Sequence, residues 1–409
     1  MEMLADLLDP ATEQGEDWSA IWAGSGAAAL SGRADGPPLD VPHAMVRLAV
    51  MATARIAAVT SRLGRAVELD GPALLGERAA LTGFTRQGDI SCGGATRLIS
   101  ARDGWVAVSL ARDTDLASVP AWLEVSGSGD IVAGVAARTV GELIERGVLL
   151  GMPVAGLAER LPTTLADGSR LGACAAATSV AGLVVIDLSA LWAGPLCANV
   201  LGLAGARVIK VESAGRPDGA RLGSQPFFDL LHGGHESVCI DLASADDLDL
   251  LGRLIERADV VIESSRPRAL AQLGIVGERC RRPRVWLSIT GHGRDDANAM
   301  RVGFGDDAAV AGGLVTMDAH GPCFCADAVA DPLSGMVAAA AVLTALERGD
   351  RWLVDVALAR TAALAARGER TDIGGLNLAE PRARAVIAEA TPLGQHRAAV
   401  VADLDGGSI

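Results

Sequence analysis

The sequence has no tyrosine, a single lysine at position 210 and no run of about 18 apolar residues that could cross a membrane. Its longest apolar stretches, such as SGMVAAAAVLTAL, are shorter than a membrane span and are typical of buried helices. The first twenty residues are acidic and lack the charged and then apolar pattern of a signal peptide. We therefore expect a cytoplasmic protein with no membrane partner.

Excess positive charge is also missing, because the formal net charge is −14 at pH 7. Proteins that bind nucleic acid carry a basic surface, so nucleic acid is excluded as a partner. An anionic ligand would have to be held by local arginines or by backbone N–H groups. The seven cysteines are an odd number in a large chain with no secretory pattern, which predicts reduced thiols rather than a disulfide framework.

The sequence lacks a recognisable metal or nucleotide motif. Cys323-x-Cys325 with Asp327 has no second ligand pair at zinc spacing, so we interpret the cysteines as packing residues on one face of a strand. His232-Gly-Gly-His235 predicts a loop that faces a site or solvent rather than a metal centre. No G-x-G-x-x-G, P-loop or G-x-S-x-G pattern occurs. We expect no metal and no permanently bound cofactor.

The sequence does contain enough apolar residues for a large core. Its 409 residues are 50% hydrophobic and 21% charged, which suits two or three globular domains. Between 181 and 300, apolar strand segments alternate with helical ones, which predicts an α/β fold with a Rossmann-like, doubly wound and mostly parallel sheet. Ligands bind such sheets beyond the carboxyl ends of the strands, here near 193–195, Glu212, 264–266 and 290–293.

The first 175 residues follow a different pattern. TRLISARDGWVAVSL predicts a β-hairpin with its turn at Asp103-Gly104, and VAARTVGELIERGVLLG predicts a helix that ends at Gly151. Residues 160–180 have the composition of a linker. We therefore divide the chain into residues 1–175, which carry a small α+β domain, and a Rossmann-like domain over 176–409.

A weak internal repeat connects these two parts. A Gly-Pro pair at 36 and another at 321 are each followed by an aspartate, Asp70 and Asp355, 34 residues after the glycine. Both segments enclose an alanine-rich apolar helix, which predicts an internal duplication. The repeat places Val46 opposite Asp331, so we expect one active site per chain.

The segment HGPCFCADAVADPLSG, residues 320–335, leaves two interpretations open. Asp331, followed by proline and a long apolar helix, has the pattern of a helix N-cap. A carboxylate at a helix N-terminus also keeps its charge, because the free N–H groups stabilise an anion, and an ionised carboxylate can attack a thioester carbonyl. The pattern alone does not decide between a cap and a nucleophile.

Residues 181–366 resemble the class III, or formyl-CoA transferase-like, CoA transferases and their relatives the α-methylacyl-CoA racemases. The resemblance rests on the segments VVIDLSALWAGP, GARVIKVES, ESVCIDL, ADVVIESSRPRALAQLGI, SITGHG and ADPLSGMVAAAAVLTALERG and on their order. The closing ATPLGQH is similar to a C-terminal segment of the family. Residues 90–160 are similar to its small domain, which normally follows the sheet domain. Here it comes first, in what resembles a truncated family copy.

The resemblance implies an acyl-CoA:carboxylate CoA transferase. In the family, an aspartate in a D-x-x-[ST]-G segment attacks acyl-CoA and passes through a mixed anhydride and an aspartyl-CoA thioester, and Asp331 falls at this position. Asp306 falls near an acidic position that assists. The racemase branch uses a histidine after the glycine that corresponds to Gly303. Phe304 stands there and cannot exchange a proton, which favours a transferase over a racemase or isomerase.

The resemblance also places coenzyme A, the thioester substrate, across the carboxyl edge of the sheet. Basic residues that the family uses on CoA are replaced at Ser213 and Gln272, among others, and we expect Arg221, Arg266 and Arg268 to substitute for them. The expected contacts of CoA are Trp192, Ala193, Ser213, Arg221, Ile240, Asp241, Ser264, Ser265, Arg266, Gln272, Gly303 and Phe304.

The expected partners are an acyl-CoA and a small carboxylic acid. Members of the family form interlocked dimers, so we expect either a homodimer or a pseudo-dimer that the repeat builds within one chain. The replaced basic residues leave a different class of function open, a catalytically silent CoA-binding protein.

Overall fold

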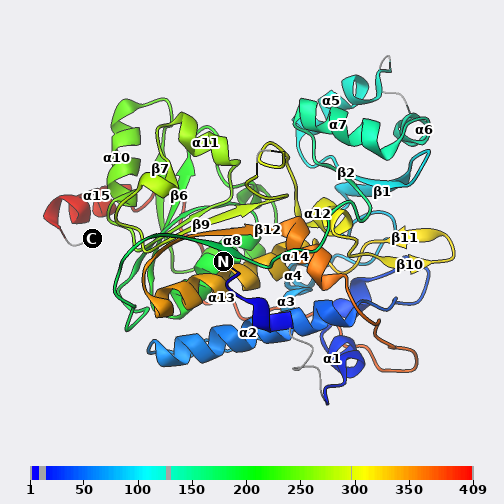
Figure 1. Cartoon of the computed structure of the whole chain (residues 1–409), viewed down its shortest axis with the longest axis horizontal. Helices are drawn as coiled ribbons and strands as arrows, with labels where there is room; N and C mark the ends of the chain where they lie inside the picture. Colours follow the sequence, from blue (N-terminus) through cyan, green and yellow to red (C-terminus); the bar gives the residue numbers. More distant parts are fainter. Residues whose placement is uncertain (1, 9–14, 126–129, 296, 408–409) are drawn as a thin grey trace.

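A seven-stranded sheet forms the centre of the computed structural model, which describes residues 2–8, 15–125, 130–295 and 297–407 (Figure 1). The strand order is β4-β12-β9-β8-β5-β6-β7. All neighbouring strands are parallel except β4, which pairs with β12 in the antiparallel sense. The predicted α/β fold with a mostly parallel sheet is therefore confirmed. The strands are β4 Asp167–Gly172, β5 Val184–Leu188, β6 Arg207–Ser213, β7 Glu236–Ile240, β8 Val260–Glu263, β9 Val285–Thr290 and β12 Arg351–Ala357.

Alternate residues of each strand enter different cores, as the period of two along a strand requires. On β5, for example, Val185 lies in a core with the helices α8 (Ala193–Leu203), α13 (Ala330–Arg348) and α2 (His43–Arg62). Its neighbour Ile186 lies in a second core with α10 (Ala245–Ile255) and α15 (Arg397–Gly406). Both faces of the sheet are covered, which explains why its strands are apolar throughout.

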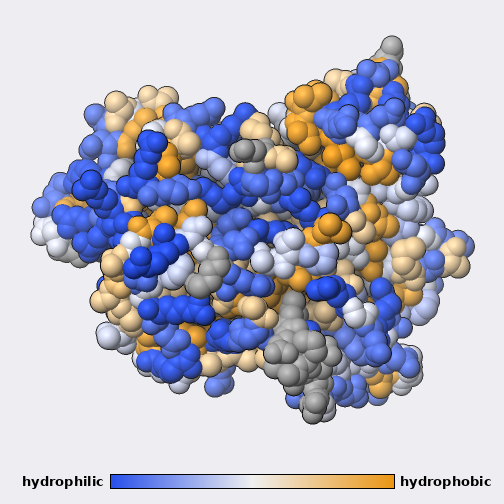
Figure 2. Space-filling model, in the orientation of Figure 1, coloured by the Kyte–Doolittle hydropathy of each residue, from blue (hydrophilic) through white to orange (hydrophobic). Residues whose placement is uncertain are grey.

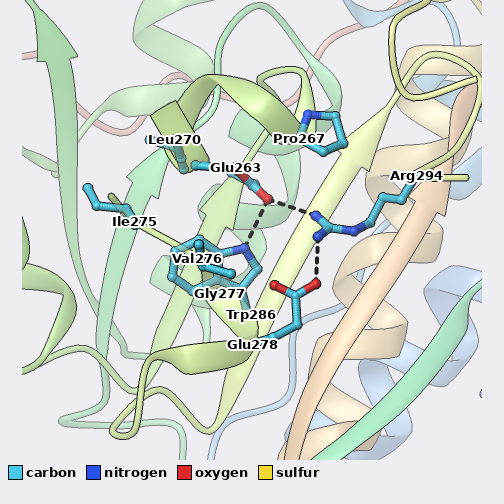
Figure 3. Close-up of a pocket in the computed structure, with 10 residues that line it drawn as sticks. Glu263, Pro267, Leu270, Ile275, Val276, Gly277, Glu278, Trp286 and Arg294 are labelled. Carbon is cyan, nitrogen blue, oxygen red and sulfur yellow. Dashed lines mark hydrogen bonds and ion pairs between the residues drawn. The ribbon is translucent and has the colours of Figure 1, made fainter. Parts of the chain in front are cut away.

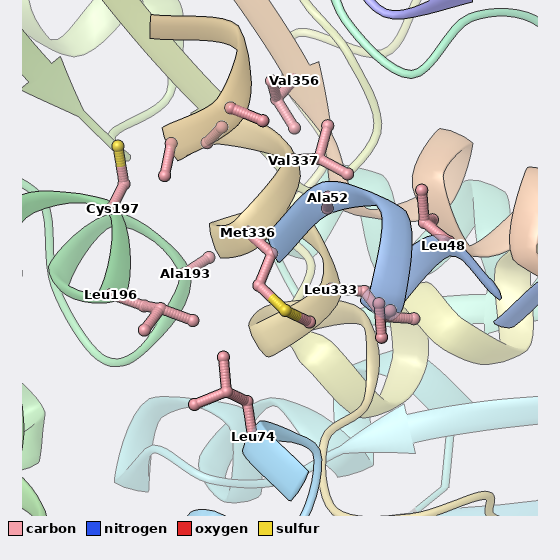
Figure 4. Packing of buried hydrophobic residues seen from close by; sticks show 14 of the residues in the cluster. Leu48, Ala52, Leu74, Ala193, Leu196, Cys197, Leu333, Met336, Val337 and Val356 are labelled. Atoms are coloured by element: carbon pink, nitrogen blue, oxygen red, sulfur yellow. The ribbon is translucent and has the colours of Figure 1, made fainter. Parts of the chain in front are cut away.

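Helix α13 passes through the middle of the larger core (Figure 4). Leu333, Met336 and Val337 pack among residues of α2, α8 and β12, and the alanines of 338–341 are completely buried. A Cβ atom on Gly335 would lie 2.8 Å from the carbonyl oxygen of Ala193, so only glycine permits this approach to α8. Helices α2 and α13 are long and apolar enough to cross a membrane, but 61% and 94% of their apolar windows are buried inside the molecule, as expected for core helices.

A small unit with its own core lies beside the large sheet. Its antiparallel sheet, β1 (Thr96–Ser100), β2 (Trp105–Ser109) and β3 (Val154–Gly156), is covered by α5 (Asp113–Leu123), α6 (Ile131–Ala136) and α7 (Val140–Leu150). The predicted hairpin is confirmed by the pairing of Ser100 with Trp105. The predicted end of a helix at Gly151 is confirmed by its left-handed conformation after α7. Figure 2 shows hydrophobic side chains on this unit, where Leu149 is 85% exposed.

The small unit is attached to the large one through α12 (Gly305–Ala311). Leu98 and Ala107 of the small sheet pack against Val310 of α12 and against Phe324, which follows the hairpin of β10 (Thr316–Asp318) and β11 (Gly321–Cys323). Strand β4 belongs to residues 1–175 but extends the large sheet, because it pairs with β12. The division of the chain at 175 stays a prediction.

Two ion pairs join residues that are 285 positions apart, which is also the spacing of the Gly-Pro repeat. Arg33 Nε lies 2.6 Å from Asp318, and Arg62 pairs with Glu347. Equivalent positions that contact each other are typical of a two-fold axis between two similar halves. Helices α2 and α13, which hold the repeated alanine-rich segments, also pack against each other.

The remaining elements connect and close these layers. Residues 366–396 contain no helix or strand and run back along the N-terminal helices, where Ala379 N donates to Ala23 O at 2.9 Å. The helices not yet named are η1 Ala5–Leu8, α1 Trp18–Gly24, η3 Ala27–Leu30, α3 Gly71–Leu74, α4 Glu77–Thr82, η4 Gly219–Leu222, α9 Gln225–His232, α11 Pro267–Gln272, η5 Gly277–Arg279 and α14 Leu358–Ala365.

The substitution Leu343→Ala in α13 should lower the free energy of unfolding by about 2–5 kcal/mol, because the side chain is fully buried and its loss leaves a cavity. The matched change Leu222→Ala removes the same atoms from a side chain that is 87% exposed and should change stability by less than about 0.5 kcal/mol. Urea unfolding measures both variants. Equal effects would contradict the central position of α13.

Candidate active site

Asp331 lies in the first turn of α13, and Val329 occupies the N-cap position. The prediction that Asp331 itself caps the helix is therefore wrong. The chain already turns into the helix at Ala328, whose carbonyl oxygen accepts from Asp331 N at 2.8 Å, so the first turn begins before the aspartate. Pro332 is tolerated because the amides of the first turn have no helical partner.

Asp306, on α12, is the second carboxylate of the site. Its two oxygens accept from Ala328 N at 3.2 Å and from Thr96 Oγ1 at 3.4 Å, so it bridges the small sheet and the loop before α13. Burial raises the pKa of Asp306 to about 6, and the negative charge of Asp327 adds to the increase, although Arg78 opposes it. Burial raises the pKa of Asp331 to about 7, and the negative charges of Asp306 and Asp327 add to the increase. The positive charge of Arg78 lowers the same pKa but is the weaker influence.

These pKa values correct the expectation that the helix terminus keeps Asp331 fully ionised. The helix N-terminus favours the anion by about 0.3–2 kcal/mol, whereas burial beside two other carboxylates acts in the opposite direction and is stronger here. The pKa of Asp331 is thus raised into the neutral range. A carboxylate with a pKa near the working pH combines nucleophilic strength with an available charged form.

Arg78 is the positively charged member of this group, and no sequence pattern indicated it. Its guanidinium donates to both oxygens of Asp327, at 2.8 and 2.5 Å, and Asp327 is completely buried. The same guanidinium lies 5.1 Å from the centre of the Trp192 ring and 5.8 Å from that of Phe84. Arg78 lies 249 positions from Asp327 on the short helix α4, so no local pattern could connect the two residues.

The backbone around the carboxylates is tightly constrained. Ala326 and Ala328 adopt positive φ angles of 52° and 44°, which are unfavourable for residues other than glycine. A Cβ atom on Gly305 would lie 2.5 Å from Asp331 Oδ2 and 2.4 Å from Ala328 O. Glycine at 305 therefore allows α12 to approach the Asp331 carboxylate.

The small sheet contacts α12 through a further buried carboxylate. Asp307 accepts from Ser109 Oγ at 2.8 Å and from Phe304 N at 3.0 Å. Burial raises its pKa to about 7 despite these two hydrogen bonds. Asp307 is fully buried and holds the small sheet through its hydrogen bond from Ser109. Asp306 and Asp331 are partly accessible, so they are the carboxylates that a substrate could reach.

The predicted CoA contacts lie mainly at one edge of the sheet, after the parallel strands β8, β5, β6 and β7. Ala190 N donates to Ser264 Oγ at 3.1 Å and Ala214 N to Ile240 O at 2.8 Å, so the loops after these strands contact each other. Ser213, Asp241, Ser265 and Arg266 follow the same strand ends, Gly303 and Phe304 precede α12, and Gln272 lies at the far end of α11.

Two of these predicted contacts have side chains that are already engaged. Trp192 is 1% exposed and packs edge-on against Phe227, while the neighbouring Ala193 begins α8. Arg221 forms hydrogen bonds to both oxygens of the buried Glu212 and lies over the ring of Phe228. The guanidinium of Arg221 is therefore neutralised within the fold rather than presented to a ligand.

A cluster of arginines offers a different set of cations. Burial lowers the pKa of Arg266, and the positive charges of Arg268, Arg112 and Arg216 lower it further. In the part of the chain that the structure describes, no side-chain hydrogen bond or ion pair involves Arg216, Arg266 or Arg268. Arg112 comes from the small unit and lies 5.7 Å from the centre of the Phe304 ring, but its guanidinium already pairs with the buried Asp115 and donates to Gly151 O at 3.0 Å. Sequence reasoning had identified Arg266 and Arg268 but had missed Arg112 and Arg216.

A hollow under α11 fixes the loop that carries Arg266 (Figure 3). At its centre Glu263 accepts from the indole N–H of Trp286 at 3.0 Å and from Arg294 at 3.1 Å, and Arg294 also donates to Glu278 at 2.8 Å. These polar groups satisfy one another. We interpret the hollow as a support for residues 264–268 rather than as a binding site.

The residues considered for a metal do not form a site. Among the described residues, no group of three or more His, Cys, Asp or Glu side chains could hold an ion. Cys323 ends β11 and Cys325 lies beyond it, so the two buried cysteines pack against the fold without sharing one strand face. His232 and His235 are also buried, which corrects the predicted exposed loop, because His232 packs against Phe228 at the end of α9.

The substitution Gly305→Ala tests the close approach of α12 to Asp331. The added methyl group would overlap Asp331 Oδ2 and Ala328 O, so we expect a loss of stability of about 1–3 kcal/mol and a displaced Asp331 carboxylate. Gly252→Ala, where the methyl group would meet open space, is the matched control and should be neutral or slightly stabilising. Thermal unfolding and a crystal structure of each variant measure the effect. An undisturbed Asp331 would contradict the described geometry.

The chain is similar in sequence to known CoA-transferases. The chain is 31% identical over 204 residues to a succinate–glutarate CoA-transferase of Agrobacterium fabrum, with coverage of 44% of this chain and 50% of that protein. It is 29% identical over 203 residues to an (R)-2-hydroxy-4-methylpentanoate CoA-transferase of Clostridioides difficile, with coverage of 44% and 51%. The chain thus spans about half the length of these relatives.

A solved structure of a CAIB/BAIF family protein from Brucella suis aligns with 45% of this chain and 54% of that one, at 28% identity and a TM-score of 0.42. The profile of CoA-transferase family III matches residues 180–386, just over half of the chain, which includes most of the large sheet, α12 and α13. The chain therefore belongs to CoA-transferase family III.

Proposed function

We propose that the protein transfers coenzyme A from an acyl-CoA to a small carboxylic acid and that Asp331 is the nucleophile. The observation that carries this proposal is the partly accessible Asp331 carboxylate, with a pKa of about 7, on the D-x-x-S-G segment at the start of α13. A buried carboxylate that served only as a structural cap would need a backbone partner at the N2 or N3 amide. Among the described residues no N2 or N3 amide of α13 donates to Asp331, and its backbone partner is Gly305 of α12.

The reaction proceeds by exchange of acyl groups without a redox change. The Asp331 carboxylate attacks the thioester carbonyl, a C–O bond forms, the C–S bond breaks, and CoA thiolate leaves behind a mixed anhydride. The thiolate then attacks the Asp331 carbonyl carbon, releasing the first carboxylate and forming an aspartyl-CoA thioester. The acceptor carboxylate repeats the two steps in reverse, which regenerates Asp331 and yields the new acyl-CoA. Asp306 assists by holding Ala328 N and a proton near the exchanging oxygens.

The arginine cluster supplies the cations for CoA in this proposal. The positive charges of Arg268, Arg112 and Arg216 act on Arg266, and phosphate groups bound beside it would relieve that repulsion, because guanidinium groups suit phosphate geometry. Arg112 adds positive charge from the side of the small unit, although its guanidinium already pairs with Asp115. The named substrates of the two relatives are small carboxylic acids, which supports an acceptor of the same class.

We also infer that the chain is an internal duplication that forms a pseudo-dimer. The reciprocal pairs Arg33–Asp318 and Arg62–Glu347 and the packing of α2 against α13 support this inference. Val46, opposite Asp331, is completely buried in α2, so one active site per chain is expected. A homodimer remains the other arrangement. We also propose a cytoplasmic location, because all seven cysteines are free and reduced thiols are typical of that compartment.

Two alternatives predict different outcomes. A racemase needs a second base. The histidine nearest in sequence to Gly303 is His292, which lies beside Gly303 but is fully buried. Burial and the positive charges of Arg301 and Arg160 lower the pKa of His292. Exchange of an α-proton in deuterated water without an acceptor acid would identify this activity. A silent CoA-binding protein is favoured by the engagement of Arg221, and it would bind CoA without turnover on any acid.

The substitution Asp331→Asn should lower kcat for CoA transfer by about 1000-fold or more, because an amide cannot form the anhydride. Binding of the acyl-CoA should change little. Hydroxylamine added during turnover should convert Asp331 of the wild type to a hydroxamate, which mass spectrometry of the peptide detects. Asp246→Asn changes an exposed aspartate in the first turn of α10 and serves as the control. Full activity of Asp331→Asn would refute the proposal.

The substitutions Arg266→Ala and Arg216→Ala should each raise KM for the acyl-CoA about 10- to 100-fold while kcat changes less, because one charge-assisted contact to a phosphate is lost. Arg282→Ala, an exposed arginine before β9, should leave KM unchanged. Steady-state kinetics at varied acyl-CoA concentration separates the two constants. An Arg282 effect as large as the others would indicate general electrostatic attraction instead of a defined phosphate site.

A further inference from the structure

The region around Asp331 contains more negative charge than the fold neutralises. Asp306, Asp327 and Asp331 lie together, and Arg78 is the cation that acts on all three. Burial lowers the pKa of Arg78, but the attraction of these carboxylates outweighs it and raises the pKa above its ordinary value. Arg78 is therefore always charged.

Arg78 is held in place from three sides. Its guanidinium binds Asp327 through two parallel hydrogen bonds and lies against the rings of Trp192 and Phe84. The preceding residue, Glu77, is 1% exposed and anchors α4, because Arg384 donates to both of its oxygens at 2.6 and 3.0 Å. Arg384 in turn donates to Asn199 of α8 at 3.0 Å. The position of Arg78 is thus fixed by the fold and not by a flexible surface contact.

The partner of Arg78 is fixed as well. Asp327 stands between Ala326 and Ala328, the two residues with positive φ. Ala326 N donates to Ser31 Oγ at 3.1 Å, and Ala328 N donates to Asp306 at 3.2 Å. Residues from the N-terminal part of the chain and from α12 therefore hold a strained segment in one conformation. Moving Asp327 would move the start of α13 and with it Asp331.

We propose that Arg78 is a positioning residue of the transfer site, which holds the strained 326–328 segment through Asp327 and keeps enough positive charge beside Asp331 for its carboxylate to ionise. This inference rests on the proposed function of Asp331. It assigns a role in the reaction to the N-terminal part of the chain, which lies outside the region that matches the family. The site is then assembled from both parts of the same chain.

The charged groups that face Asp331 determine the expected pH dependence. Arg78 of α4 lowers the pKa of Asp331, whereas Asp306 of α12 and Asp327 of the preceding loop raise it. Asp307, next to Asp306 on α12, accepts from Ser109 Oγ and Phe304 N, and the buried thiol of Cys92 is neutral because burial raises its pKa. Removing Arg78 and removing Asp327 must therefore move the ionisation of Asp331 in opposite directions.

The test measures the ionisation of Asp331 directly and the kinetics separately. Infrared difference titration follows the protonated carboxyl band, which is assigned by its loss in Asp331→Asn. In Arg78→Met the midpoint should rise by about 1 pH unit or more, and in Asp327→Asn it should fall below that of the wild type. The acid limb of kcat should move with the midpoint, so kcat of Arg78→Met at pH 7 should fall about fivefold or more while KM changes less.

Two further variants separate charge from folding. Arg78→Lys keeps the charge and should restore most of the wild-type midpoint, although lysine cannot form the two parallel hydrogen bonds. Arg78→Met/Asp327→Asn removes both buried charges and so leaves no unpaired one. Its midpoint should lie between those of the wild type and Arg78→Met, because Arg78 affects Asp331 more strongly than Asp327 does. Arg97→Met, an exposed arginine on β1, is the control and should match the wild type.

The outcomes are distinguishable from failure of the proposed function. If the wild type has no transferase activity but the infrared midpoints move as described, the transfer reaction is refuted and the charge balance stands. If the midpoints of Asp327→Asn and the double variant equal that of the wild type, or if both single variants move in the same direction, the role of Arg78 is refuted. Should Arg78→Met fail to fold, Asp327→Asn, Arg78→Lys and the double variant decide the question.

Discussion

The buried ion pair between Arg78 and Asp327 connects the two parts of the chain at the point where the carboxylates gather. Asp327 is completely buried, so leaving it without Arg78 would place an uncompensated charge in the interior, at a cost of several kcal/mol. The pair holds α4 of the N-terminal part against the loop that begins α13. Asp327 stands between the two residues with positive φ, Ala326 and Ala328, so the same contact holds the strained segment that precedes Asp331.

The fold supplies the environment in which such a pair can exist. Helix α13 is almost entirely buried, and small residues allow α8 and α12 to approach it closely. Close packing removes water from Asp331 and Asp306, and that desolvation, together with the neighbouring charges, brings their pKa values to about 7 and 6. A site that performs acyl exchange at neutral pH needs a nucleophile that ionises there, so packing and chemistry are linked through one physical quantity.

The N-terminal part contributes more than a cover for the sheet. It supplies β4 to the edge of the sheet, α2 to the core, Arg78 to the carboxylates and Arg112 to the arginine cluster. In the duplication that we propose, its first helices occupy the position of a second copy, and the ion pairs at a spacing of 285 support this proposal. We interpret the chain as one in which a duplicated half has taken over the contacts that a partner subunit makes in the interlocked dimers that the resemblance implies.

The sequence by itself determined the elements with strong local patterns. The β-branched runs of β5, β6, β8 and β9, the Asp-Gly hairpin turn and the Gly151 helix end follow from nearest neighbours, and so they were predictable. The local pattern at Asp331 allowed a helix cap as well as a nucleophile, and only the resemblance of its D-x-x-S-G segment to the family favoured the second. Tertiary structure alone decided that β4 pairs with β12, that Asp331 lies inside the first turn, and that its pKa is raised. The pairing of β4 with β12 and the effect of Arg78 on Asp331 depend on residues more than a hundred positions away, and the raised pKa depends on burial, which no local pattern specifies.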